Sequence, residues 1–302
     1  MAFRELRERL KGERKKGRVQ LILDDHTYIG DFGKQAEAVL KHRPDVVLHE
    51  ILNTGGQPSE EMERIAALLD KYEEHVRELR KKGYVLSRYR LPDNVHEYEN
   101  PKNIDRALQA IKIMERQLIQ EKEQLQKMAK RNKWAVEKLK EKDDLHRRVL
   151  EIKEVITLLK NYDTTGLVKA ANILRVARKQ GAEFKGLEPA EAASKHVVAL
   201  AKGDARGLLQ AISERNRAMA EEIIRHLEGG KRVTAVMGAL HGAEVYRILK
   251  ERGYDVDVKF FEDGVDWREA LENQARAGAY SEEIRRRAIE ALLEALRMQG
   301  KR

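Results

Sequence analysis

Two histidines and one glutamate stand where short apolar runs end. His26 follows residues 19–23 (VQLIL), Glu50 follows residues 46–48, and His241 follows residues 233–237 (VTAVM). If these runs are parallel strands, loops at their carboxyl ends converge on one edge of the sheet, so we expect the three side chains to share a site. Two imidazoles and a carboxylate suit a divalent ion such as Zn, Mn, Co or Fe, which would activate a bound water. The chain has no cysteine, so nitrogen and oxygen must supply every ligand.

Each of these residues also has a simpler interpretation. A histidine at a strand end often serves only as a structural hydrogen-bonding group. His49 must point to the opposite face of its strand from Glu50, so we assign the chemical role to Glu50. Gly238 and Gly242 flank His241. They either form a strand-to-helix turn or let the backbone approach a ligand near a helix N-terminus.

The elements around this site follow an α/β pattern. Before residue 100, the apolar runs and a weaker strand candidate at residues 84–89 alternate with helical segments at residues 33–42 and from Ser59 to just before Gly83. After residue 230, predicted strands at residues 233–237 and 256–261 flank a predicted helix at residues 242–252. Such a β-α-β series requires right-handed crossovers and a parallel sheet.

A long helical segment separates the two α/β stretches. Residues 102–165 contain neither Gly nor Pro over 64 positions, and apolar residues recur every seventh position from Ile104 to Leu125. One straight helix of this length would extend about 96 Å, so we expect a hairpin that folds back between residues 130 and 144. Helices are expected to continue to about residue 227. Such a hairpin would also allow a homodimer.

The predicted fold is therefore α/β, with a mostly parallel sheet flanked by helices and split by a long α-helical hairpin insertion. The first half of the core is assigned to residues 1–100, the insertion to residues 101–209, and the second half with a C-terminal helix at residues 281–298 to residues 210–302.

The composition of the chain limits the classes of partner that we expect. Charged residues make up 37% of the chain, as in heat-adapted proteins with surface ion-pair networks. The net charge is +9, but acids and bases interleave at helical spacing, so we expect nucleic acid not to be a partner. The charged residues 1–18 have a helical pattern with no apolar leader, and no segment reaches the roughly 18 apolar residues of a membrane span. We expect a cytoplasmic protein with no membrane partner.

Two segments resemble a known family. Residues 19–50, VQLILDDHTYIGDFGKQAEAVLKHRPDVVLHE, are similar to the opening of the TraB, TIKI and pheromone-shutdown proteins, where one strand ends in GxxH and the next in a glutamate. Residues 214–223 (ERNRAMAEEI) and the following KRVTAVMGALHGAEVYRILKERGYDV resemble their second half, where an Arg-Asn pair precedes a second GxxH. The wider superfamily includes erythromycin-esterase-like and ChaN-like proteins. The resemblance covers about a third of the chain.

The resemblance implies a role for each matching residue. His26 and His241 would bind a metal or position water, and Glu50 would act as a ligand or general base. Arg215 would stabilise an oxyanion or clamp a carboxylate, and an ion pair with Glu50 is the ordinary alternative. Asn216 would hold the geometry around the site.

Four further residues belong to the first of these segments. Leu23 stands where the family has glycine, and Asp24 takes the place of an acid found in the esterase-like branch. Asp25 would support the site or only cap the loop, and Tyr28 would lie beside His26.

These expectations add up to a metal-dependent hydrolase that cleaves a peptide or another amide or ester bond in a peptide or small molecule. Two alternatives stay open. One is a binding protein without turnover, in which the histidines and Tyr28 or Tyr246 meet a haem or a metal. The other is an interaction protein built on the helical hairpin, with a vestigial site.

Overall fold

The computed structural model describes residues 16–24, 29–50, 57–83, 91, 95, 98, 101–130, 132–161, 164–187, 191, 194, 195, 198, 199, 202 and 204–261. By spatial contact the chain divides into two compact units. An α/β unit takes its described residues from the segments 1–25, 38–59 and 177–302, and a helical unit takes them from the segments 26–37 and 60–176.

One five-stranded parallel sheet forms the centre of the α/β unit. Its strands are β1 (Lys16–Asp24), β2 (Val46–His49), β3 (Glu183–Gly186), β4 (Val233–Gly238) and β5 (Tyr254–Lys259), in the spatial order β3-β2-β4-β1-β5. All four neighbouring pairs are parallel, and Val19 on β1 lies opposite Val233 on β4. This confirms the predicted α/β fold, in which strands from the two ends of the chain share one sheet.

Strand alternation directs one set of apolar side chains toward two helices of the α/β unit. Leu21 and Leu23 of β1, Leu48 of β2 and Ala235 and Met237 of β4 are buried in the same cluster as apolar residues of two helices. These helices are α8 (Ala205–Glu228) and α9 (Ala239–Glu251), which pack against each other and against the strands. Strand residues that point to this face of the sheet, the α8/α9 face, therefore lie next to side chains of α8 and α9.

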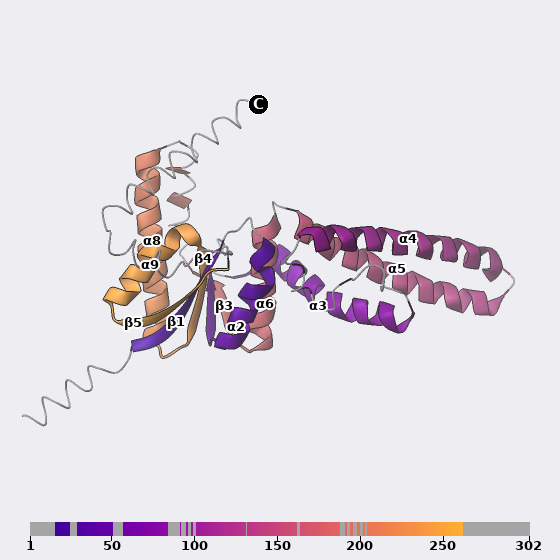
Figure 1. The fold of residues 1–302 in the computed structure, drawn as a ribbon, viewed down its shortest axis with the longest axis horizontal. Coiled ribbons are helices and arrows are strands. Elements are labelled where there is room, and N and C mark those ends of the chain that lie inside the picture. The colour runs from indigo at the N-terminus through magenta and orange to yellow at the C-terminus, as the bar shows by residue number, and fades with distance from the viewer. Residues whose placement is uncertain are drawn as a thin grey trace, which may run out of the picture. The chain divides into compact units, whose positions relative to one another are not determined.

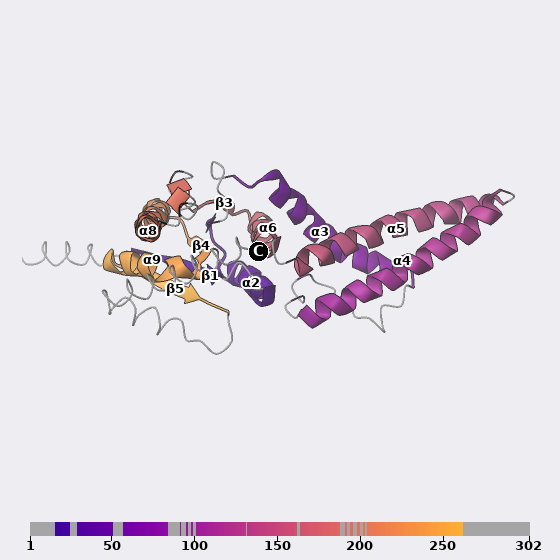
Figure 2. The ribbon, with the colours of Figure 1, turned by 90° about the horizontal axis from the view of Figure 1, so that it is seen from above.

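The helical unit contains the predicted hairpin. Its long helices are α4 (Pro101–Ala129) and α5 (Lys133–Lys160), which run side by side (Figures 1 and 2). Helix α5 begins at Lys133, so the chain reverses at the early edge of the predicted window. Helix α3 (Glu60–Lys81) packs on α5, and Ser59 directly precedes it as expected. The unit also holds the short helix η1 (Ile29–Asp31) and most of α6 (Thr165–Lys179), and α2 (Phe32–His42) passes from this unit into the other.

Three sequence predictions about local structure differ from the structure. Strand β3 lies inside a stretch expected to be helical to residue 227. Helix α9 begins at Ala239 rather than at Gly242, because the chain turns at Gly238. Residues 16–18 belong to β1 instead of an N-terminal helix. The strand candidate at residues 84–89 and the C-terminal helix at residues 281–298 lie outside the described residues, as does most of the N-terminal segment.

None of the helices in the described part of the chain combines the length and the apolar character needed to cross a bilayer.

Candidate functional site

Glu50 is held at the carboxyl end of β2. Its backbone N–H donates to the carbonyl of Val236 on β4 at 3.0 Å, which continues the sheet ladder one residue past the strand. Alternation then places its side chain on the same face as Leu48, toward α8 and α9, and only 11% of this side chain is exposed. His49 lies on the other face, where its ring meets Phe184 at a centroid distance of 5.9 Å.

Three groups converge on the Glu50 carboxylate. Arg215 on α8 donates to Oε1 at 2.8 Å, and the backbone N–H of Gly238 donates to Oε2 at 2.5 Å. The Nε2 atom of His241 lies 3.2 Å from Oε1. Gly238 directly precedes α9, so the carboxylate also sits at the positive end of that helix. Because Arg215 and the Gly238 N–H both donate to this carboxylate, it has little capacity to remove a proton from water.

His241 is oriented from its other nitrogen. Asn216 on α8 is fully buried and donates its Nδ2 to Oε2 of Glu244 at 2.7 Å, and Oδ1 of Asn216 lies 2.5 Å from Nδ1 of His241. A carboxylate can only accept, so the amide nitrogen of Asn216 must face Glu244 and its oxygen must face His241. Nδ1 of His241 therefore carries a proton, and Nε2 is the ring nitrogen that faces Glu50.

This arrangement requires a positive species between His241 and Glu50. Nε2 and Oε1 are both acceptors when the ring is neutral, so either a second proton on the ring or a cation must join them. Two atoms 3.2 Å apart can both lie about 2.1 Å from one ion, so the pair fits as two ligands of a divalent metal. The described residues contain no group of three His, Cys, Asp or Glu side chains able to hold a metal. A third side-chain ligand would have to lie elsewhere.

The remaining predicted residues have different positions. His26, Asp25 and Tyr28 lie outside the described residues. Asp24 is the last residue of β1 and is buried opposite Gly238 in the register, but alternation directs it away from the α8/α9 face that Leu23 occupies. The structure thus brings together Glu50, Arg215, Asn216, Gly238 and His241.

Leu23 and Gly242 fit each other. A Cβ atom placed on Gly242 would lie 2.6 Å from Cδ2 of Leu23, far inside van der Waals contact, and Leu23 is fully buried. Leu23 therefore fills the space left by a glycine on α9. Its side chain belongs to the apolar core.

Sequence reasoning missed Glu244 and Ser213. Ser213 Oγ donates to Oε1 of Glu244 at 3.2 Å, so this buried carboxylate has a donor at each oxygen. The signal was present as spacing: Glu244 follows His241 by three residues and Ser213 precedes Asn216 by three, which places each pair on one helix face. The first spacing was not recognised because α9 was expected to begin at Gly242.

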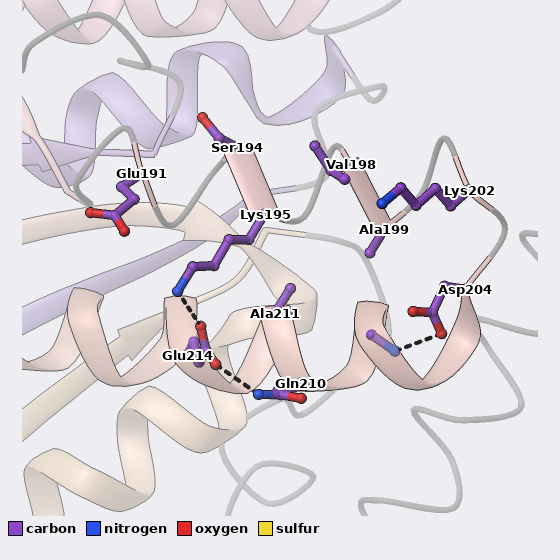
Figure 3. Close-up of a pocket in the computed structure, with 11 residues that line it drawn as sticks. Glu191, Ser194, Lys195, Val198, Ala199, Lys202, Asp204, Gln210, Ala211 and Glu214 are labelled. Atoms are coloured by element: carbon purple, nitrogen blue, oxygen red, sulfur yellow. Dashed lines mark hydrogen bonds and ion pairs between the residues drawn. The ribbon is translucent and has the colours of Figure 1, made fainter.

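A separate pocket of about 540 Å³ opens beside the first half of α8 (Figure 3). Glu214 contributes to it and accepts hydrogen bonds at 3.0 Å from both Lys195 and Gln210. Successive helical residues are rotated by about 100°, so Glu214 faces this pocket while Arg215 faces Glu50. None of the residues predicted to form the active site lines it.

Comparison of the chain with protein-family models, curated proteins and solved structures finds no match.

Proposed function

We propose that this protein is a metal-dependent hydrolase of the TraB/TIKI type that cleaves a peptide or another amide or ester bond. The observation that carries the proposal is the pair of His241 Nε2 and Glu50 Oε1, 3.2 Å apart, with His241 held from behind by Asn216 and Glu244. A metal-binding histidine commonly donates its other ring N–H to such an outer partner, which fixes the tautomer and the ring plane.

The side chains divide the work in the following way. His241 offers the Nε2 lone pair, and Glu50 serves as an anionic ligand rather than as the base, because Arg215 and Gly238 already donate to it. A bound divalent ion would polarise the substrate carbonyl and make an attached water more acidic. Arg215 balances the charge of Glu50. By resemblance, His26 would be the third protein ligand.

The metal content of purified variants tests the proposal directly. His241→Ala should lose bound divalent metal, and Asn216→Ala should bind it roughly 10–100-fold more weakly because the ring is no longer oriented. The matched control is His226→Ala, which removes an equally buried histidine from α8 that pairs with Glu222 at 3.1 Å, outside the site. Metal is measured by elemental analysis after incubation with Zn, Mn, Co or Fe and removal of free ion.

Hydrolysis is measured on the same samples with peptide, amide and ester substrates, before and after chelation. The wild type and His226→Ala should hydrolyse at least one substrate class and lose this activity with the metal, whereas His241→Ala should be inactive. His241 is buried and has partners at both nitrogens, so some loss of stability is expected and does not decide its role. Full metal content in folded His241→Ala would overturn the proposal.

A further inference from the structure

The stem of the α4/α5 hairpin is closed by ion pairs between its two helices. Four lysines each meet a carboxylate of the facing helix at 2.5 to 2.7 Å: Lys122 with Asp143, Lys142 with Glu121, Lys153 with Glu115, and Lys160 with Asp105. These pairs neutralise four of the lysine charges along the stem. They also join the two helices to each other along the length of the hairpin.

The turn has a different charge pattern. Residues 124–136 include Lys127, Lys130, Arg131 and Lys133 but no acidic residue. Lys127, Lys130 and Lys133 are exposed, and in the part of the chain that the structure describes none of them forms an ion pair. The tip of the hairpin, which we define as residues 124–136, is thus a local concentration of uncompensated positive charge.

Exposed apolar side chains lie among these lysines. Trp134 is 54% exposed, Met128 45% and Val136 38%, and all three are within six residues of the turn. Helix α5 begins beside these lysines, where Asn132 caps it by accepting the backbone N–H of Trp134 at 3.0 Å. An exposed tryptophan, methionine and valine so close together in the sequence are a candidate contact surface for a partner.

We propose that the hairpin tip binds the surface of a bilayer that contains anionic phospholipids. Lysines attract the negative headgroups, and a tryptophan ring is well suited to the boundary between headgroups and acyl chains. Met128 and Val136 would enter the same boundary. Nucleic acid has no comparable apolar layer for these two side chains. A second copy of the tip carries the same charge and would be repelled. We expected no membrane partner because the sequence contains no spanning segment, but binding at the surface requires none.

Vesicle sedimentation of the full chain tests this proposal. Wild-type protein should sediment with vesicles of equimolar phosphatidylcholine and phosphatidylserine and stay in solution with pure phosphatidylcholine. Lys127→Gln/Lys130→Gln/Lys133→Gln should lose most of this binding, at least 10-fold, because each lysine contributes separately to the attraction. The matched control, Lys112→Gln/Arg116→Gln/Lys140→Gln, removes the same charge from exposed stem positions and should bind like the wild type.

Tryptophan fluorescence reports the apolar part of the contact. The chain has two tryptophans, so a Trp267→Phe background leaves Trp134 as the only tryptophan. Its emission should shift to shorter wavelength on anionic vesicles and be quenched by brominated acyl chains. Equal loss of binding in the two triple variants, an unshifted Trp134 spectrum, or tip-dependent binding of nucleic acid that anionic vesicles do not displace would each overturn the proposal.

Discussion

Asn216 donates its amide to Glu244 across 2.7 Å, and this contact decides which nitrogen of His241 carries a proton. The amide cannot turn around while the carboxylate faces it, so its oxygen stays on Nδ1 of the ring. Glu244 therefore controls His241 without touching it. The carboxylate acts through the orientation of one buried amide.

Glu244→Leu should move the proton of His241 from Nδ1 to Nε2. Without the carboxylate the amide of Asn216 can rotate and donate to the ring, and Nδ1 must then accept. Long-range ¹H–¹⁵N spectra of histidine-labelled protein distinguish the two tautomers, with His241→Ala to assign the signal. Glu244→Gln keeps a carbonyl acceptor and should retain the wild-type tautomer. A wild-type ring that carries its proton on Nε2 and none on Nδ1 would contradict the assignment of the network.

Replacing Arg215 distinguishes its two predicted roles. The side chains of Arg215 and Glu50 are only 9% and 11% exposed, so Arg215→Met leaves a buried carboxylate without its main counter-charge. We expect a loss of about 3–5 kcal/mol in the free energy of unfolding, measured by urea denaturation. Arg215→Met/Glu50→Gln should recover part of it. An unchanged free energy of unfolding would instead indicate that Arg215 serves to bind a substrate.

Gly242→Ala should destabilise the protein by about 1–3 kcal/mol, because its methyl group would overlap the buried side chain of Leu23. Leu23→Ala alone opens a cavity and costs about 2–5 kcal/mol. The double variant should lose clearly less than the sum of the two, since each change makes room for the other. Leu21→Ala provides the control background, in which Gly242→Ala should stay fully destabilising. Additive losses in both backgrounds would contradict the predicted contact.

The stability of the protein should decrease as the pH is lowered, because His42 titrates. Burial lowers the pKa of His42 below its ordinary value of 6.5, and the charge of Arg18 lowers it further. Below pH 6.5 His42 is protonated in the unfolded chain before it is protonated in the folded chain. The free energy of unfolding therefore decreases as the pH falls. His42→Gln keeps a polar partner for Thr234, at 2.8 Å in the wild type, but removes the titration.

The free energy of unfolding measured between about pH 7 and about pH 5 should therefore fall less steeply in His42→Gln than in the wild type. Burial also lowers the pKa of His226, so His42→Gln/His226→Gln should flatten the dependence further. Identical slopes in the wild type and in His42→Gln would show that this histidine does not couple to folding.

Local sequence determined most of the elements of this protein. Strands β1, β2 and β4 contain short apolar runs, which a buried sheet accommodates well, and β5 alternates apolar and charged residues. The hairpin follows from the 64 residues without Gly or Pro. Strand β3 escaped prediction because its four residues expose Glu183 and bury only Phe184 deeply, so its assignment depends on pairing with β2. Only the tertiary structure supplies that partner.

The site was determined by the sequence only in part. Residue type and strand-end position identified Glu50 and His241, because parallel strands share the edge at which they end. The partners of these two residues were decided by packing: Arg215 and Asn216 reach them from α8, and the early start of α9 places Glu244 one helical turn after His241. Hydrogen bonds between distant segments depend on how helices lie on the sheet, and no local pattern in the sequence encodes that placement.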